Sequence, residues 1–307
     1  MKIGLIDVDG HNFPNLPLMK ISAWHKAQGD HVEWYSPMLS EHMDKVYLSK
    51  VFSFSTDYQY HIDADEIAKG GSGYCINLAD GREVFDKSMD AELPYEIEHI
   101  YPDYSIYGIT DTAYGFLTRG CPRGCSFCHV EAKEGRASRK VAALSEFWSG
   151  QKNIVLCDPN ILACKQWKDL LESLIESKAY VDFNQGLDIR LMTEEKAEMI
   201  KRIKTKGIHF AWDQYKDLEM IVPKFKLFKD VTGIDQYKLS VYVLCGFDTT
   251  LEQDLERIYT LRDLGYLPYV MLYNKENIPR GHDLRRLQRW VNNRRIFKTV
   301  SRFEDYK

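Results

Sequence analysis

Three cysteines are the residues of this chain whose spacing most directly indicates chemistry. Cys121, Cys125 and Cys128 stand at C-x3-C-x2-C spacing in the run TRGCPRGCSFCH, residues 118–129. The glycines and the proline of this run supply the turns that three thiolates need to face one centre. A cluster of four irons normally takes four thiolates. Three from one loop leave one iron open, and an open metal position is where a ligand binds and reacts.

A regular alternation of strands and helices follows and must position this loop. We expect strands at 114–118, 153–157, 180–184, 207–212, 238–244 and 268–273, and helices near 142–150, 163–178, 193–205, 217–229 and 251–264. Leu170, Leu171 and Leu174 show the spacing of a helix that buries one face. Six strand–helix units predict a partial (β/α)6 TIM-like barrel over residues 113–275, short of the usual eight units.

The N-terminal segment predicts a small Rossmann-like α/β domain over residues 1–78. A strand at 2–7, a helix at 18–27 and a strand at 31–35 form a βαβ unit, which implies parallel pairing and a doubly-wound sheet. Ligands of such sheets bind at the carboxyl ends of the strands. We expect residues 79–112 to be a linker and residues 276–307 to be a basic helical extension.

On these residues the chain resembles the radical S-adenosylmethionine superfamily. The cysteine run lies after the first expected barrel strand, and aromatic Phe127 precedes the third cysteine. The lead-in Thr-Arg-Gly-Cys-Pro is similar to members with an N-terminal cobalamin-binding-type domain, a class that includes methyltransferases. The resemblance is strong over residues 113–273 and weaker over residues 1–78.

The resemblance implies an enzyme that uses two cofactors. Cys121, Cys125 and Cys128 would hold a [4Fe-4S] cluster, whose fourth iron would chelate the amino and carboxylate groups of S-adenosyl-L-methionine. An electron from a flavodoxin- or ferredoxin-type donor would cleave that cofactor to methionine and a 5′-deoxyadenosyl radical, which acts on an unknown substrate. Such chemistry belongs to the cofactor, while the protein positions and shields it.

Two later strand ends carry candidate contacts to S-adenosylmethionine, each with an ordinary alternative. The resemblance places Asp158 and Asn160 against its amino group, whereas the alternative is a turn that caps the next helix. Arg190 would pair with its carboxylate through the planar guanidinium. Arg190 and Asp188 would otherwise form an ordinary surface ion pair.

The remaining candidates lie at the third, fourth and fifth strand ends. Asn184, Gln185 and Asp188 suit the ribose hydroxyls or the substrate. Asp213 would contact substrate, or else cap the following helix. Gly246 would let the backbone approach the adenine closely.

The N-terminal domain departs from the cobalamin pattern. The run Asp-x-His-x-x-Gly that ligates this cofactor has only Asp9-Gly-His11 as a near match, without the full spacing. Some relatives bind cobalamin without the histidine, so cobalamin stays open. We expect a degenerate domain, because residues 1–78 are short for enclosing so large a cofactor.

Two alternatives belong to other classes of protein. In the first, the cysteines and His129 bind zinc as a Cys3His set, although adjacent residues seldom both ligate one tetrahedral ion. In the second, the metal stabilises a nucleic-acid-binding module that uses the arginines beside Trp290. The two classes combine in a radical methyltransferase acting on RNA. An RNA-binding domain typical of that branch has no obvious counterpart in the sequence.

Composition and charge limit which cellular compartment and which kinds of partner we expect. The chain has 44% hydrophobic and 28% charged residues, ordinary values for a soluble globular protein. No signal peptide or membrane span is expected, and clustered cysteines favour metal binding in a reducing cytoplasm over disulfides. The net charge of −4 is uneven, because residues 280–307 hold nine Lys or Arg against three acids. This basic segment is either a solvated helix face or a contact for phosphate or another acidic surface.

Overall fold

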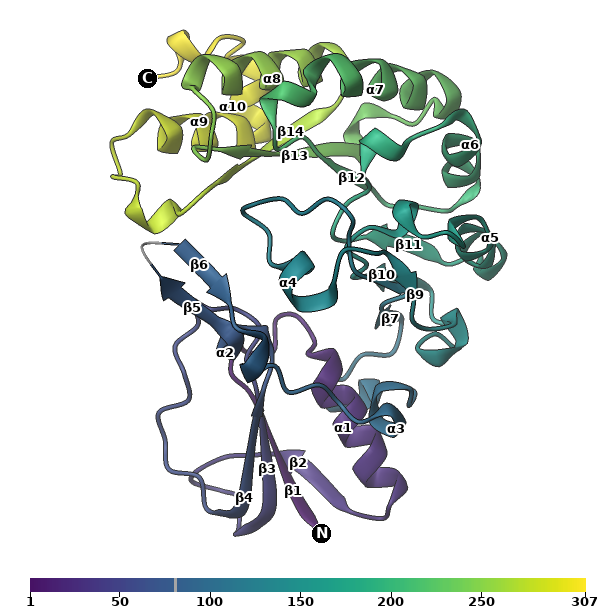
Figure 1. The fold of residues 1–307 in the computed structure, drawn as a ribbon, viewed down its shortest axis with the longest axis vertical. Coiled ribbons are helices and arrows are strands. Elements are labelled where there is room, and N and C mark those ends of the chain that lie inside the picture. Colours follow the sequence, from purple (N-terminus) through teal and green to yellow (C-terminus); the bar gives the residue numbers. More distant parts are fainter. Residues whose placement is uncertain (80–81) are drawn as a thin grey trace. The chain divides into compact units, whose positions relative to one another are not determined.

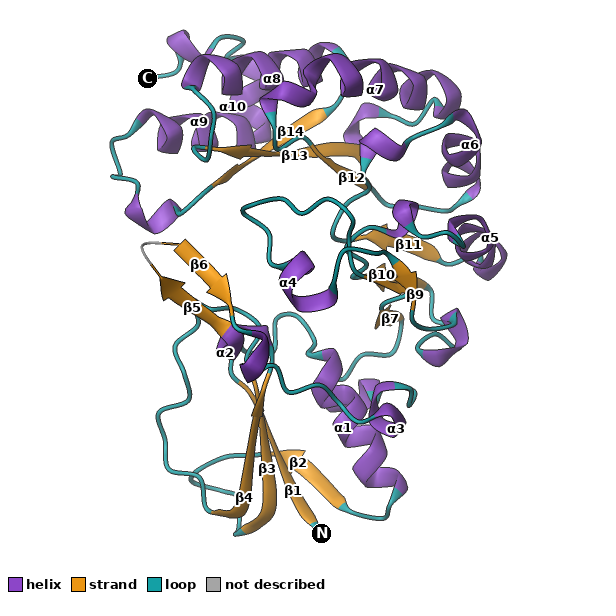
Figure 2. Cartoon of the chain, viewed as in Figure 1, coloured by secondary structure: helices purple, strands orange, loops and turns teal. Residues whose placement is uncertain are grey.

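The computed structural model describes residues 1–79 and 82–307 (Figure 1). The chain divides into two compact units, residues 1–155 and 156–307, and each is described by itself. Both contain helices and parallel strands, as expected for the α/β class (Figure 2). This division follows compactness, and the domain limits expected at residues 78, 112 and 275 stay predictions.

The first unit opens with a parallel sheet in the strand order β2-β1-β3-β4. Its elements are β1 (Lys2–Asp7), α1 (Leu16–Ala27), β2 (His31–Trp34), β3 (Met43–Ser49) and β4 (Ala64–Gly70). The expected βαβ unit and its parallel pairing are confirmed. Asn15 caps α1, since its side chain accepts a hydrogen bond from the Leu18 N–H (3.3 Å).

The two faces of this sheet are covered differently. Ile3 and Leu5 of β1 pack with Leu18 and Ile21 of α1 on one face. Ile6 lies in a second core cluster on the other face, where Tyr58 comes from the segment 50–63 that joins β3 to β4. That segment, all of it described, contains no helix. The doubly-wound expectation therefore holds for one face only, and an aromatic loop takes the place of the second helix.

The rest of the first unit is built from short elements. They are α2 (Ser72–Cys75), β5 (Ile76–Ala79), β6 (Arg82–Phe85), α3 (Tyr95–Glu98), β7 (Thr112–Gly115), β8 (Thr118–Arg119), α4 (Val130–Glu134), β9 (Arg139–Lys140) and β10 (Asn153–Leu156), which crosses the unit boundary. The segment 79–112, expected as an irregular linker, carries β6 and α3. The Ile97 and Tyr104 side chains are buried.

The helix expected over residues 142–150 is wrong. Only a single 3-10 turn forms, at Leu144–Glu146. The Phe147 ring packs so closely against Gly115 that a Cβ there would lie 2.4 Å from the ring. The Tyr104 hydroxyl also donates a hydrogen bond to the Phe147 carbonyl (2.7 Å), an acceptor that a continuing helix would use.

The second unit repeats strand and helix. Its elements are α5 (Trp167–Ser177), β11 (Tyr180–Phe183), α6 (Glu194–Arg202), β12 (Ile208–Ala211), α7 (Leu218–Thr232), β13 (Leu239–Cys245), α8 (Leu251–Asp263), β14 (Leu267–Leu272), α9 (Asp283–Asn292) and α10 (Arg294–Thr299). The strands β12, β13 and β14 form a parallel sheet in that order. The strands and helices expected in this part of the sequence are confirmed, with ends that differ by a few residues.

Helix α9 protects the outer strand of that sheet. The side chains of Gln288 and Asn292 donate hydrogen bonds to the Val270 carbonyl of β14, and Asn292 also accepts one from the Val270 N–H (2.8 Å). An uncovered strand edge would otherwise offer unpaired backbone groups to another chain. None of the described helices is long and apolar enough to span a lipid bilayer.

Candidate functional site

The three cysteines lie on a loop whose ends are joined by a short antiparallel ladder. β8 precedes the loop and β9 follows it, with Thr118 opposite Lys140 and Arg119 opposite Arg139. Gly120 makes this closure possible. Its φ is +86°, and a Cβ there would lie 2.3 Å from the Ala137 carbonyl oxygen, so a side chain at this position would clash with backbone.

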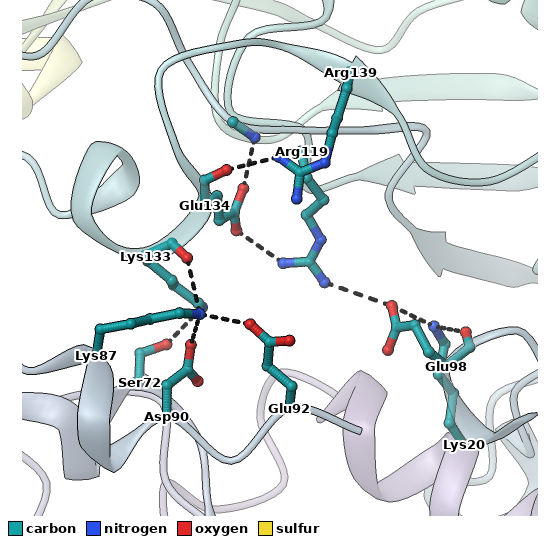
Figure 3. A network of polar contacts seen from close by, with 11 residues as sticks. Lys20, Ser72, Lys87, Asp90, Glu92, Glu98, Arg119, Lys133, Glu134 and Arg139 are labelled. Carbon is teal, nitrogen blue, oxygen red and sulfur yellow. Dashed lines mark hydrogen bonds and ion pairs between the residues drawn. The ribbon is translucent and has the colours of Figure 1, made fainter. Parts of the chain in front are cut away.

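Glu134, at the end of α4, fastens the same closure (Figure 3). One carboxylate oxygen accepts from the Arg119 guanidinium (2.9 Å), and the other accepts from the Gly120 N–H (2.9 Å). Arg139 of β9 donates to the Glu134 backbone carbonyl (2.7 Å). The segment 120–134 is therefore closed by a ladder and a largely buried ion pair, and it contains all three cysteines.

A half-buried lysine holds α4 to the preceding part of the first unit. Lys133 donates to the Ser72 hydroxyl (2.8 Å), and burial lowers the pKa of its ammonium. Lys87 donates to the Lys133 carbonyl (3.3 Å) and pairs with Asp90 and Glu92, as Figure 3 shows. Helix α4, which follows the cysteines, is therefore anchored at its carboxyl end by residues that lie outside the cysteine loop.

The thiols themselves sit on a turn-rich segment. The Cys128 N–H donates to the Cys125 carbonyl (2.9 Å), and the Cys121 N–H donates to the Gly135 carbonyl (3.2 Å). Cys121, Cys125 and the neighbouring Phe127 are half-buried, and Cys128 is exposed. Three accessible thiols on one closed loop fit the donor chemistry of an iron–sulfur cluster. Across residues 1–79 and 82–307 no three His, Cys, Asp or Glu side chains group closely enough to hold a metal ion, so the ligand set stays a prediction.

The zinc alternative required His129 beside the cysteines. In the structure the His129 Nε2 lies 3.3 Å from the Glu83 carboxylate. Its backbone carbonyl accepts from Lys133 in the first turn of α4 (2.9 Å). The imidazole is therefore engaged by a carboxylate from β6, and the Cys3His set stays an untested alternative.

In the second unit, the strand-end candidates Asn160 and Asp188 meet. The Asn160 amide donates to Asp188 Oδ2 (3.1 Å). Asp158 and Asn160 are 5% and 3% exposed, so both are part of the interior. Asn160 stands at the N-cap of the 3-10 helix Ile161–Ala163, yet the described contacts of that helix include no side-chain cap. The capping alternative is therefore met in position by Asn160, but without a described side-chain hydrogen bond.

Arg190 is held between two carboxylates. Its Nε donates to Asp188 Oδ1 (2.8 Å), and NH1 donates to Asp217 Oδ2 (3.3 Å). The expected Arg190–Asp188 pair forms, but it is largely buried and so is not an ordinary surface pair. Asp217 was missed in the sequence, because nothing in its spacing indicated that it faces Arg190.

Asp213 follows β12 in an environment that disfavours its charge. Burial raises the pKa of this carboxyl to about 6, although Arg257, Arg190 and a hydrogen bond with the Leu244 backbone act in the opposite direction. The N-caps of the next two helical segments are Gln214 and Asp217, so the capping alternative for Asp213 is wrong. A carboxyl that titrates near pH 6 can exchange a proton under ordinary conditions.

Arg257 is a second residue that sequence reasoning missed. It lies on α8, is fully buried, and pairs with the equally buried Asp254 (2.5 Å). Its guanidinium donates to the carbonyls of Trp212 (2.7 Å), Asp213 (3.0 Å) and Leu244 (2.8 Å). Arg257 therefore joins the carboxyl ends of β12 and β13. The Asp-x-x-Arg spacing on the buried face of an amphipathic helix was the available signal.

The other three candidates are accounted for by local structure. Gly246 has φ +79°, a left-handed conformation that favours glycine, and a Cβ there would lie 2.8 Å from the end of the Leu284 side chain of α9. Asn184 is half-buried and donates its N–H to the Leu156 carbonyl (3.0 Å). Gln185 is exposed on the turn that ends β11.

Two cysteines outside the loop, Cys75 and Cys245, are buried structural residues. Burial raises the pKa of the Cys245 thiol and of the Cys75 thiol. Both are fully buried, Cys75 in the first unit and Cys245 in the second. A buried thiol with a raised pKa is a poor metal ligand and behaves as a small apolar side chain.

The basic C-terminal segment makes many contacts within the second unit. Arg285 donates to the carbonyls of Lys275 (2.6 Å) and Ile278, and the Arg286 guanidinium lies 4.3 Å from the Phe303 ring. Trp290 is fully buried and donates to the Val300 carbonyl (2.9 Å). The Trp290 ring therefore belongs to the core, and the alternative in which the neighbouring arginines bind nucleic acid stays untested.

Two groups of residues thus carry the candidate chemistry, the closed cysteine loop of the first unit and the carboxylate–guanidinium groups at the strand ends of the second. A scan of the chain against protein-family models finds no match, and a search of curated proteins finds none either.

Proposed function

We propose that this chain is a radical S-adenosylmethionine enzyme. The single observation that carries the proposal is the C-x3-C-x2-C run on a loop whose ends are locked by β8, β9 and Glu134. When bound, a [4Fe-4S] cluster with one open iron supplies an electron that cleaves S-adenosylmethionine. Cys121, Cys125 and Cys128 are the residues that would hold it.

The loop architecture supports this role in physical terms. A cluster binds with less loss of entropy when its ligands already lie on a constrained segment. Glu134 constrains that segment from one end by binding both Arg119 and the Gly120 N–H. Phe127 directly precedes Cys128 and is half-buried.

In the proposal, the strand ends of the second unit contribute the contacts to S-adenosylmethionine. Asp158 and Asn160 offer acceptors for its ammonium group, and a desolvated charge-assisted contact of this kind contributes about 1.5–3 kcal/mol. Arg190 offers a guanidinium that is oriented by Asp188 and Asp217. Asp213, with its pKa raised to about 6, is the residue suited to accept or release a proton.

A partial (β/α)6 barrel is the architecture that belongs to this proposal. It is supported by the parallel sheet β12-β13-β14, with α7 between β12 and β13 and α8 between β13 and β14. We leave cobalamin out of the proposal. The run Asp9-Gly-His11 lacks the full spacing of the ligating motif, and the His11 ring lies against Trp34 (4.3 Å between centroids) and Tyr107 (5.5 Å).

Anaerobic reconstitution with iron and sulfide tests the proposal. We expect a brown protein with about four irons per chain. With a reductant and S-adenosylmethionine it should form methionine and 5′-deoxyadenosine, and Cys125→Ala should abolish both the colour and the product.

Cys245→Ala is the matched control, because that thiol is fully buried in the second unit and outside the cysteine run, and the variant should leave iron content unchanged. A colourless protein that retains one zinc per chain, lost in Cys125→Ala, would instead support the zinc alternative. Iron loading without 5′-deoxyadenosine would mean that the loop holds a cluster but not the proposed activity.

A further inference from the structure

A pocket of about 400 Å³ opens beside the parallel sheet of the first unit. We call it the N-terminal pocket. It lies where β1 and β2 end, and the segment 50–63, which replaces the second helix layer, forms its other wall. The carboxyl edge of a parallel sheet is the usual place for a ligand, and this volume suits a small organic molecule.

Four aromatic side chains and one imidazole line the pocket. The lining includes Trp34 at the end of β2, Tyr35 after it, Tyr58 and Tyr60 from the opposite segment, and His11. Tyr58 and Tyr60 meet edge to face (5.6 Å between centroids). The Tyr58 hydroxyl is buried and has no hydrogen-bond partner within the described part of the chain.

The charge in this pocket is negative and unevenly compensated. Two carboxylates line it, Asp7 and Asp57. Asp57 has a cation near it, Lys69 (3.3 Å), and accepts from the Tyr74 hydroxyl (2.6 Å). Asp7 accepts only from neutral groups in the described structure, the Tyr107 hydroxyl (2.7 Å) and the Asp9 N–H (3.3 Å). None of the described residues that line the pocket is Lys or Arg.

We propose that the N-terminal pocket binds an organic cation of the alkylated or quaternary ammonium class. Aromatic faces attract such cations through the ring quadrupole, and a nearby carboxylate supplies the opposite charge. An anionic ligand would have to enter without a Lys or Arg partner and against Asp7. A neutral ligand would leave that carboxylate uncompensated.

The electrostatics of Asp7 support this assignment. Burial raises the pKa of Asp7, which means that its ionised form lacks stabilisation in the pocket. The groups that act on it are Tyr107 and His11, which favour the charge together with the Asp9 N–H, and the Asp9 carboxylate, which opposes it. A bound cation would supply the missing stabilisation. This inference is independent of the cysteine loop.

Calorimetric titration of the full chain tests the proposal with three probes. Choline is the cation, 3,3-dimethylbutan-1-ol is its neutral isostere, and adenosine monophosphate is an anionic aromatic ligand. We expect choline to bind at least about tenfold more tightly than the isostere, because only the cation gains the contacts to Asp7 and the rings. Adenosine monophosphate should not bind.

Two variants locate the site. Asp7→Asn keeps the size and the hydrogen-bond acceptor but removes the charge, and should weaken choline binding by about tenfold or more. Tyr60→Ala truncates a ring that is 69% exposed, so the fold should survive while affinity falls by about threefold to tenfold. Asp65→Asn is the matched control, since Asp65 is an exposed carboxylate paired with His42 outside the pocket.

Each outcome decides the proposal. Equal affinity for choline and its neutral isostere would overturn it, because charge would then play no part. Binding of choline that Asp7→Asn and Tyr60→Ala leave unchanged would place the ligand elsewhere and also overturn it. Tight binding of adenosine monophosphate alone would assign the pocket to anions, and absence of binding by all three probes would remove the ammonium class.

Discussion

Asp213 shows how burial changes the behaviour of a single side chain. An aspartate in an unfolded chain titrates near pH 4, whereas burial raises the pKa of Asp213 to about 6 in the folded protein. The folded state therefore binds a proton more readily than the unfolded state. The free energy of unfolding therefore decreases as the pH rises from about 4 to 6, and the full destabilisation by the buried Asp213 carboxylate is present above pH 6.

Asp213→Asn should remove the destabilisation that the ionised Asp213 carboxylate causes above pH 6. At pH 7.5 we expect the free energy of unfolding to increase by about 1–3 kcal/mol relative to the parent, because the amide carries no charge to desolvate. Below pH 4 the difference should vanish. Urea unfolding across pH 3.5–8 measures it, and a variant that is less stable at pH 7.5 would contradict the argument.

Glu134 and Glu131 provide a matched pair on one helix. Glu134 is largely buried and binds Arg119 and the Gly120 N–H, while Glu131 pairs with the exposed Arg136 (3.3 Å). We expect Glu134→Ala to lower the free energy of unfolding by about 2–3 kcal/mol, because the Gly120 N–H loses its acceptor and the half-buried Arg119 guanidinium keeps only the more distant Glu98 (3.9 Å). Glu131→Ala should cost less than about 1 kcal/mol, as exposed pairs do.

The same two variants separate stability from cluster assembly. After anaerobic reconstitution, Glu134→Ala should retain less iron than Glu131→Ala, since its loop ends are no longer fastened. Iron content and visible absorbance give the comparison. Equal loading in both variants would show that the β8–β9 ladder suffices to close the loop.

At the scale of elements, α8 stabilises the ends of β12 and β13 through one side chain. Arg257→Met should lower the free energy of unfolding by about 3–5 kcal/mol, because it leaves the fully buried Asp254 charge and three carbonyls without their donor. Arg262→Met, on the same helix but partly exposed, should cost less than half as much. Denaturant unfolding of both variants measures the difference.

A compensating change sharpens this test. Asp254→Asn combined with Arg257→Met should recover part of the loss, because the unpaired buried charge is then removed. If the double variant is as unstable as Arg257→Met alone, the cost comes from the backbone carbonyls and not from Asp254.

Elements also show where sequence patterns succeed. Helices α5 and α8 were predictable because a 3,4 spacing of apolar residues, or a capping box at Thr250 and Gln253, determines them locally. The prediction of a helix over residues 142–150 was wrong for a non-local reason. The helical pattern of this segment is overridden by packing of Phe147 on Gly115 and by a hydrogen bond from Tyr104, and neither partner is near in sequence.

For the whole molecule, ligand binding and folding are linked. A cluster that binds only the folded chain adds to its stability by mass action. We expect the anaerobically reconstituted protein to unfold about 5 °C or more above the metal-free protein. A chelator should reverse this shift, and Cys125→Ala should not show it. Differential scanning calorimetry measures it, and an unchanged midpoint in the loaded parent would contradict the linkage.

The sequence by itself determined the local features of this protein. The cysteine spacing, the parallel βαβ start and the strand–helix alternation all depend on residues close together in the chain, so composition and periodicity reveal them. It left the pairing of Arg190 with Asp188 open, as the alternative to a contact with S-adenosylmethionine.

Only the tertiary structure decided which distant residues meet. Glu134 on Arg119, Arg257 on the ends of two strands, and Tyr58 opposite Trp34 at one pocket are each products of chain crossings that spacing does not encode. The sequence also did not show which side chains are buried. Trp290 lies in the core and Asp213 has a raised pKa because other segments exclude water from them. Desolvation depends on neighbours in space, and that is the physical reason for the division.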